Sequence, residues 1–243
     1  MDLGITGRTA VITGASRGIG AATARMLEQE GARVLAVSRT EGLDVTDPRA
    51  PERIVEALGG RAPDILVNNA GTSFARSLDD LTDEDWTEQW ELHVMASLRT
   101  MRAAVPRMKE HGGGRIVNVA SSAGKRPSLT NAAYSVTKAA MLSLSRVFAD
   151  SFAAEGVLVN AVAPGAVGSP LWMGEGGLGD QTAAARGITR EEALRIQAGK
   201  VPVGRFATED EIASVVAFLC SERASMVAGA AWSVDGGTVA TIV

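Results

Sequence analysis

The chain has 243 residues, which is enough for one sizeable core but marginal for two ordinary domains, so we expect a single domain over residues 1–243. Hydrophobic residues make up 46% and charged residues 21%, which excludes a disordered or low-complexity chain. A net charge of -4, with no basic stripe, gives no attraction for nucleic acid or an anionic membrane, and neither is an expected partner.

The chain has one cysteine, Cys220, which can form neither an internal disulfide nor a metal site. Its apolar neighbours indicate a small buried hydrophobe. The N-terminal residues lack the basic start and apolar stretch of a secretion signal, and no run approaches the length of a membrane span. We therefore expect a cytoplasmic protein without a metal ion.

Short runs rich in Val, Ile and Leu alternate along the chain with stretches of helical periodicity. This pattern is typical of βαβ units, in which a mostly parallel sheet is covered by helices on both faces. Six runs predict buried strands, at residues 9–12, 33–37, 65–67, 115–119, 158–162 and 231–234.

The segment between the second predicted strand and Asp64 is too short for the helix, strand and helix that a doubly wound fold normally places there. A helix at 51–58 leaves only 41–45 for a strand. We therefore predict a doubly wound Rossmann-type α/β domain of about seven strands. Its third strand is short, and one helix near residues 40–50 is missing.

Two threonines mark helix starts, since Thr82 and Thr208 each stand three residues before an acid and offer a capping hydroxyl. These helices are expected to begin near Trp86 and Ile212. Further along, residues 164–202 contain a glycine cluster beside one predicted helix at 190–199. Long glycine-rich insertions after a strand are usually lids or binding loops, so we expect a substrate lid there.

A glycine-rich turn directly follows the first predicted strand and opens a helix. Glycine lets such a turn close and lets the backbone approach a pyrophosphate, while the helix N-terminus offers unpaired N–H groups. An ordinary strand-to-helix turn is the alternative, but the position after strand one favours nucleotide binding. The expected contacts are Gly14, Ser16, Arg17, Gly18, Ile19 and Gly20.

The second predicted strand ends at Val37-Ser38-Arg39, where an NAD enzyme would keep an acid for the ribose 2′-hydroxyl. Ser38 does not repel a phosphate, and Arg39 and Arg17 can clasp the 2′-phosphate of NADP(H). Either arginine alone is more commonly a solvated surface charge. The combination predicts NADP(H) as the cofactor.

Tyr134 and Lys138 stand four residues apart and share one face of a helix. A neighbouring ammonium favours the phenolate and lowers the pKa of a phenol, which suits proton transfer to a forming alkoxide. Tyr134 is the only tyrosine in the chain. The alternative, a packed ring beside a surface charge, would be preferred if the glycine turn were absent.

Several motifs together resemble the short-chain dehydrogenase/reductase family, and the resemblance spans essentially the whole chain. Besides the glycine turn they are Asn68-Asn69-Ala70-Gly71, Ser121, Tyr134-Ser135-Val136-Thr137-Lys138, Pro164-Gly165 and Val234-Asp235-Gly236-Gly237. Asp44-Val45 resembles the pair that binds adenine. The resemblance implies a homotetramer and cofactor contacts at Asp44, Val45, Asn69, Ala70, Gly71, Tyr134, Lys138, Pro164, Gly165, Val167 and Ser169.

The same resemblance selects the remaining catalytic candidates. Ser121, rather than its rival Ser122, lies 13 residues before the tyrosine and three before Gly124, as the family's active-site serine does. His93 is a departure, because the family usually has an asparagine there that helps hold a water beside the lysine. The imidazole either packs or carries a proton, and packing requires nothing new.

In the family that this chain resembles, a side-chain hydroxyl at the position of Ser169 contacts the nicotinamide carboxamide, and Ser169 is expected to supply that hydroxyl. The next residues either line an apolar substrate pocket or pack against the lid's own helix. They are Leu171, Trp172 and Met173.

These residues imply an NADP(H)-dependent oxidoreductase acting on a small carbonyl or alcohol. Hydride from the nicotinamide would reduce a ketone, Tyr134 would give the proton, Ser121 would hold the oxygen, and Lys138 would bind ribose. The nearest analogy is to 3-oxoacyl carrier-protein reductases and similar ketoreductases. An NAD-linked alcohol or sugar dehydrogenase and a catalytically idle NADP-binding sensor are the alternatives.

Overall fold

The structure is a computed structural model that describes residues 2–240. Its strands are β1 (Thr9–Thr13), β2 (Arg33–Val37), β3 (Ile65–Asn68), β4 (Gly114–Val119), β5 (Val157–Pro164) and β6 (Ala231–Val234). Its helices are α1 (Gly18–Gln29), α2 (Ala50–Ala57), α3 (Asp83–Trp90), α4 (Ala96–Glu110), α5 (Ala132–Phe152), α6 (Pro170–Met173), α7 (Leu178–Arg186), α8 (Arg190–Gly199) and α9 (Glu209–Cys220).

The described strands form one sheet in the order β2-β1-β3-β4-β5-β6, and every neighbouring pair is parallel. The chain order reverses direction at β1, where β2 lies on one side and β3 on the other. All six strands predicted from the apolar runs are present, but the prediction that all are buried is wrong for β2 and β6, which are exposed or half-buried at most positions because they lie at the edges of the sheet. Parallel strands bring their carboxyl ends to one edge, so the loops that follow β1, β3, β4 and β5 meet there.

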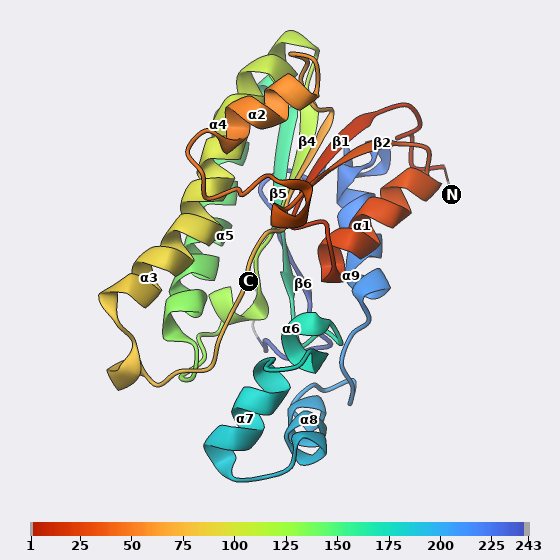
Figure 1. The fold of residues 1–243 in the computed structure, drawn as a ribbon. Coiled ribbons are helices and arrows are strands. Elements are labelled where there is room, and N and C mark those ends of the chain that lie inside the picture. Colours follow the sequence, from red (N-terminus) through yellow and green to blue (C-terminus); the bar gives the residue numbers. More distant parts are fainter. Residues whose placement is uncertain (1, 241–243) are drawn as a thin grey trace.

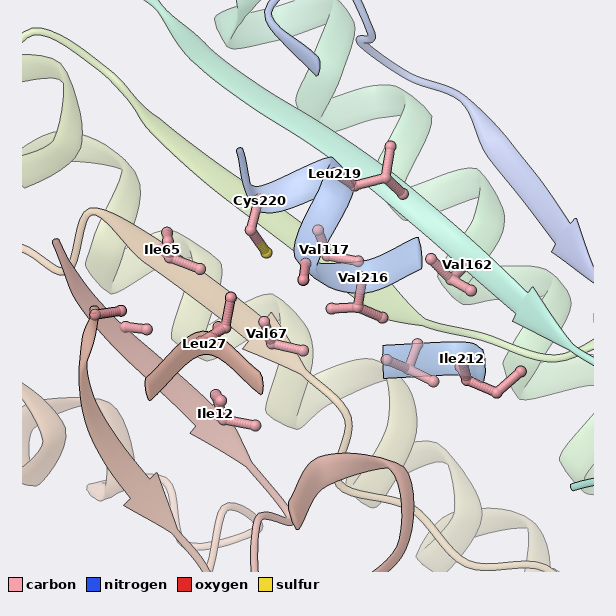
Figure 2. Close-up of a cluster of buried hydrophobic side chains, with 14 of the residues drawn as sticks. Ile12, Leu27, Ile65, Val67, Val117, Val162, Ile212, Val216, Leu219 and Cys220 are labelled. Atoms are coloured by element: carbon pink, nitrogen blue, oxygen red, sulfur yellow. The ribbon is translucent and has the colours of Figure 1, made fainter. Parts of the chain in front are cut away.

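Helices cover both faces of the sheet (Figure 1). On one face, Leu27 of α1 and Ile212 of α9 pack with Ile12 of β1 in a buried cluster (Figure 2). On the other face, Met101 of α4 and Phe148 of α5 belong to a second buried cluster. Neighbouring residues of one strand belong to opposite clusters because their side chains point to opposite faces of the sheet. The expected doubly wound α/β fold is therefore confirmed.

As predicted, the segment between β2 and β3 is shorter than in a complete doubly wound fold. It does not contain the short third strand that the sequence indicated. Residues 41–45 form no strand, and the described sheet has six strands rather than about seven. Gly42 takes the left-handed conformation at φ 73°, and the Leu43 N–H donates back to the Ser38 carbonyl at 3.0 Å. These bonds close a turn, so the backbone is not free to join a sheet.

Residues 164–202, which the sequence predicts to be a lid and which are called the lid segment here, contain more helix than their glycines indicated. The helix predicted at 190–199 is confirmed as α8, but α6 and α7 precede it. Figure 1 shows the three helices together beyond one end of the sheet. Residues 181–186 include three successive alanines, which are strong helix formers, and Gly187 ends α7 at φ 65°. The glycines at 174–179 lie at the helix ends rather than excluding helix.

Both predicted capping boxes are present, and they start α3 at Asp83 and α9 at Glu209. Cys220 is buried, as expected, and burial raises the pKa of its thiol to about 12. Within residues 2–240 no helix is long and apolar enough to cross a membrane. In the same range, no three His, Cys, Asp or Glu side chains gather into a possible metal site.

Candidate active site

A cleft of about 1840 Å³ opens at the carboxyl ends of the strands. The glycine-rich turn, the loops after β3, β4 and β5, and the lid all contribute to its walls. All the residues predicted to act in catalysis or cofactor binding line it except Gly20 and His93, which lie behind its surface. The structure therefore brings residues from the whole length of the chain into one site.

Two glycines of the turn are required by close backbone packing. A Cβ on Gly14, whose φ is +66°, would lie 2.8 Å from the Ala70 Cα, and a Cβ on Gly20 would lie 2.3 Å from the Gly14 carbonyl oxygen. The Asn69 amide donates to the carbonyls of Thr13 and Gly14 at 3.0 and 3.2 Å. The turn after β1 and the loop after β3 are thus held against each other, with the start of α1 facing the cleft.

Replacing Gly20 with alanine is expected to weaken NADPH binding by at least tenfold and to lower the midpoint of thermal unfolding. The added methyl group would meet the Gly14 carbonyl, and backbone cannot move aside as a flexible side chain can. Gly199→Ala is the matched control, because a Cβ there meets nothing within 4 Å. Cofactor titration and thermal melts of both variants provide the measurement, and equal NADPH affinity in the two would contradict the role of the turn.

At the end of β2, Ser38 is buried, and its hydroxyl oxygen accepts from the Glu41 N–H at 3.3 Å. Arg17 and Arg39 are exposed and line the cleft, and neither forms an ion pair with a carboxylate of residues 2–240. The pKa of the Asp44 carboxyl is lowered, first by the Thr46 N–H bond and also by the charge of Arg39. Arg17 and Arg39 therefore line the cleft where the sequence predicts a 2′-phosphate, and the Asp44 carboxylate adds a negative charge near Arg39.

The side chains of Ser121 and Tyr134 both line the cleft and lie within hydrogen-bonding reach of each other. Ser121 follows β4, and its oxygen accepts from the Ala123 N–H at 3.1 Å. Burial raises the pKa of the Tyr134 phenol, whereas a hydrogen bond with the Ser121 side chain lowers it. The strand end and α5 thus supply two adjacent hydroxyl groups.

Lys138 lies one turn after Tyr134 on α5, and it is 3% exposed. Its Nζ donates to the Val119 carbonyl at 2.8 Å and lies 5.5 Å from the centre of the Tyr134 ring. Burial lowers the pKa of Lys138 to about 7. The expectation that this ammonium lowers the pKa of Tyr134 is wrong for this structure, because burial dominates and Nζ is directed at a carbonyl.

His93 is fully buried in a π-helical turn, Glu91–Met95, between α3 and α4. Its ring meets the Tyr134 ring edge to face, with 5.4 Å between the ring centres. Two of its contacts, Thr72 and Thr137, were missed in the sequence. Thr137 stands inside the tyrosine–lysine motif, so its place beside the site could have been found there; no pattern marks Thr72.

The lid side of the cleft carries the remaining predicted contacts, Pro164, Gly165, Val167 and Ser169, all of which line it. Leu171 and Trp172 also line the cleft. The Trp172 ring packs against Phe206 at 5.5 Å between ring centres. Phe206 lies in the segment between α8 and α9, so this contact is not the packing against the lid's own helix that the sequence left open.

A family model described as "Enoyl-(Acyl carrier protein) reductase" matches residues 38–239, and one described as "short chain dehydrogenase" matches residues 8–45. The first match alone spans more than half of the chain. The chain belongs to the short-chain dehydrogenase/reductase family.

Among its relatives, a 3-oxoacyl-(acyl-carrier-protein) reductase of Vibrio cholerae is 33% identical over 256 residues, covering 97% of this chain and 98% of the relative. An L-xylulose reductase of Bos taurus is 34% identical over 259 residues, covering 99% and 100%.

Solved structures of other short-chain dehydrogenases/reductases share the fold over the whole chain. The crystal structure of L-sorbose reductase from Gluconobacter frateurii, complexed with NADPH and L-sorbose, aligns with a TM-score of 0.90 and 35% identity over 100% of both chains. An aldohexose dehydrogenase of Thermoplasma acidophilum aligns with a TM-score of 0.86 and 26% identity, covering 96% and 94%. This chain is accordingly an oxidoreductase of the short-chain dehydrogenase/reductase family.

Proposed function

We propose that this short-chain dehydrogenase/reductase is an NADP(H)-dependent ketoreductase with Ser121, Tyr134 and Lys138 as its catalytic residues. The observation that carries the proposal is that the Ser121 and Tyr134 side chains line the cleft within hydrogen-bonding reach of each other and beside the buried Lys138. Oxidation of a secondary alcohol is the reverse of the same reaction.

The residues along the cleft fit a dinucleotide phosphate. Gly14 and Gly20 let the turn after β1 pack closely against its own backbone and the loop after β3, and the start of α1 presents its first N–H groups to the cleft. Arg17 and Arg39 suit a 2′-phosphate at the end of β2, where an acid would repel it. When bound, the nicotinamide supplies or accepts the hydride.

The proton chemistry belongs to the chain's own side chains. The Ser121 oxygen accepts from the Ala123 N–H, and its O–H, which lies beside the Tyr134 phenol, would donate to a substrate oxygen bound between the two residues. Tyr134 then gives its phenolic proton to the oxygen on which negative charge develops. Lys138, held by the Val119 carbonyl, has further N–H donors for a ribose hydroxyl.

Relatives support a ketone as the substrate, because their names describe reductases of 3-oxoacyl groups, L-xylulose and L-sorbose. The absence of an acid at Ser38 speaks against an NAD-linked alcohol or sugar dehydrogenase. An idle NADP-binding sensor would not need the adjacent Ser121 and Tyr134 hydroxyls.

A spectrophotometric screen of ketones and secondary alcohols with NADPH, NADH and their oxidised forms tests the proposal. We expect NADPH consumption with at least one ketone and a lower rate with NADH. NADPH binding without turnover of any compound would favour the sensor instead, and equal use of both cofactors would favour the NAD-linked alternative.

We also propose the homotetramer that the family resemblance implies. Apolar side chains at Trp90 of α3 and Val147 of α5 are 42% and 57% exposed, and contact with other copies would cover them. Light scattering after size exclusion will give the mass of the assembly. Location in the cytoplasm stays a prediction.

A further inference from the structure

The imidazole of His93 joins three segments that carry the site. The π-helical turn that contains it holds the ring between the loop after β3 and the start of α5. A Cβ on Gly71 in that loop would lie 3.1 Å from the His93 Nε2 and 3.6 Å from the Lys138 Nζ. The histidine therefore lies against the lysine and the tyrosine without lining the cleft.

The hydrogen bonds around the ring define its protonation. The Thr72 N–H donates to Nε2 at 3.3 Å, so Nε2 carries no proton. Nδ1 lies 2.9 Å from the Thr137 hydroxyl oxygen, and that hydroxyl donates its only proton to the Tyr134 carbonyl at 2.9 Å. Nδ1 must then be the donor to Thr137. Both ring nitrogens are occupied, and neither is directed at the Tyr134 hydroxyl or at Lys138.

The surrounding charges agree with a neutral ring. Burial holds the pKa of His93 well below its usual range, and the Lys138 charge lowers it further, against a smaller opposing effect of the Thr72 N–H. Tyr134, the other titratable group on α5 at the ring, is uncharged at neutral pH because burial raises its pKa. Glu91, in the same π-helical turn, is paired with Arg99 at 2.8 Å. An imidazolium at this position would be buried without a counter-ion.

We propose that His93 is a positioning residue, fixed as the neutral Nδ1–H tautomer, that ties the loop after β3 to α5 and holds the Tyr134 ring in place. No proton passes through its side chain. The catalytic consequence rests on the proposed function, whereas the tautomer can be tested without any activity.

Nitrogen-15 NMR of histidine-labelled protein tests the tautomer directly, because the chain has only two histidines and the other, His111, is exposed. We expect the His93 nitrogens to keep the shifts of a neutral Nδ1–H ring from about pH 5 to 8, and the signals of the exposed His111 serve as the reference in the same spectra. Titration of His93 in this range, or an Nε2–H tautomer, would overturn the proposal.

Kinetics of three variants test the positioning role. His93→Asn should retain kcat within about tenfold, a barrier change of about 1.4 kcal/mol or less. His93→Phe keeps a ring against Tyr134 but loses the hydrogen bonds of both ring nitrogens. Of these two bonds, Thr137→Val removes only the one between Nδ1 and the Thr137 hydroxyl. Each of the three variants should lower kcat by a larger factor than it changes KM, and each should leave the shape of the pH–rate profile unchanged. A hundredfold loss in His93→Asn, with disappearance of an ionisation between about pH 5 and 7, would show that the histidine carries protons.

A second, independent inference concerns charge on the lid side of the cleft. Three exposed cations line it there: Arg126 after β4, Arg186 at the end of α7 and Lys200 after α8. None forms an ion pair with a carboxylate of residues 2–240, although the chain as a whole carries a net charge of -4. Within the described part of the chain, three carboxylates line the cleft. They are Asp44 in the segment after β2, Glu88 in α3 and Glu91 in the π-helical turn that follows α3.

Arg126 and the segment that follows Lys200 both contact the turn at residues 235–239. Arg126 donates to the Thr238 carbonyl at 3.3 Å, while Val203, three residues after Lys200, donates from its N–H to the Gly236 carbonyl at 3.2 Å. The one carboxylate of this turn, Asp235, is buried and accepts from the N–H groups of Gly237 and Val239 at 3.0 Å each. It is therefore taken up inside the turn and does not neutralise the two cations.

We infer that the substrate of this site carries an anionic group, a carboxylate or a phosphate, that Arg126 and Lys200 attract and hold at the rim of the cleft. Arg186 adds to the attraction from the far side of the lid. This inference rests on the proposed reduction of a ketone.

Oxo acids of four to eight carbons, each compared with its methyl ester, test the inference. We expect kcat/KM to favour the acid by at least tenfold, and Arg126→Gln with Lys200→Gln to remove that preference while the rate with the ester persists. Arg195→Gln on the exposed face of α8 is the matched control. An ester reduced as well as its acid would overturn the inference.

Substrate binding separates this inference from the proposed function. If no ketone of either kind is reduced, the proposed function fails. Quenching of tryptophan fluorescence, to which Trp172 in the cleft contributes, still compares the affinities of the acid and the ester, and Trp172→Phe identifies its share of the signal. Tighter binding of the acid, lost in the double variant, would support the anion site, and equal binding of the two would refute it.

Discussion

Replacing Tyr134 with phenylalanine is expected to abolish turnover and to leave NADPH binding largely intact. The variant keeps the ring, its edge contact with His93 and the Lys138 ammonium near its face, and loses only the phenolic O–H. Because Tyr134 is the only tyrosine in the chain, no second phenol can replace it. We expect the rate to fall by at least about a hundredfold, a barrier increase of about 2.7 kcal/mol or more.

Steady-state rates with the best ketone from the screen and NADPH titration by fluorescence measure the two effects separately. Ser151→Ala, exposed near the other end of α5, is the control for changes in the helix itself. A Tyr134→Phe enzyme that keeps more than a few per cent of the wild-type rate would remove this residue from the proposed mechanism.

The double substitution of Ser38 by aspartate and Arg39 by leucine should reverse the cofactor preference from NADPH to NADH. Ser38 is buried at the end of β2 and caps the following turn by accepting from the Glu41 N–H, a bond that an aspartate can also accept. The new carboxylate would accept from a ribose 2′-hydroxyl and repel a 2′-phosphate, and the second change removes a phosphate partner.

The ratio of kcat/KM for the two cofactors measures this reversal, and we expect it to change by at least about a hundredfold, or about 2.7 kcal/mol. Arg61→Leu, an exposed arginine before β3, controls for the loss of one surface charge. A wild-type enzyme that uses NADH as efficiently as NADPH would show that Arg17 and Arg39 do not select the cofactor.

Local patterns were enough to predict much of this molecule. A buried strand must be apolar at successive positions, which located the four inner strands, and the same apolar runs also marked the more exposed edge strands β2 and β6. A turn that packs backbone against backbone must use glycine, so Gly14 and Gly20 marked the start of α1. Residues four apart on a helix share a face, which placed Tyr134 and Lys138 together. In each case the physical requirement acts over a few neighbouring residues.

Tertiary structure decided what depends on distant segments. The pKa of Tyr134 is governed by burial that strands, lid and loops create together, so the pair of residues alone gave the wrong direction. The tautomer of His93 is set by Thr72 and Thr137, which lie 21 and 44 residues away in the chain. The turn at 41–45 replaced a strand because Leu43 donates back to Ser38. Burial and hydrogen-bond direction arise only when the segments meet, and no local periodicity records them.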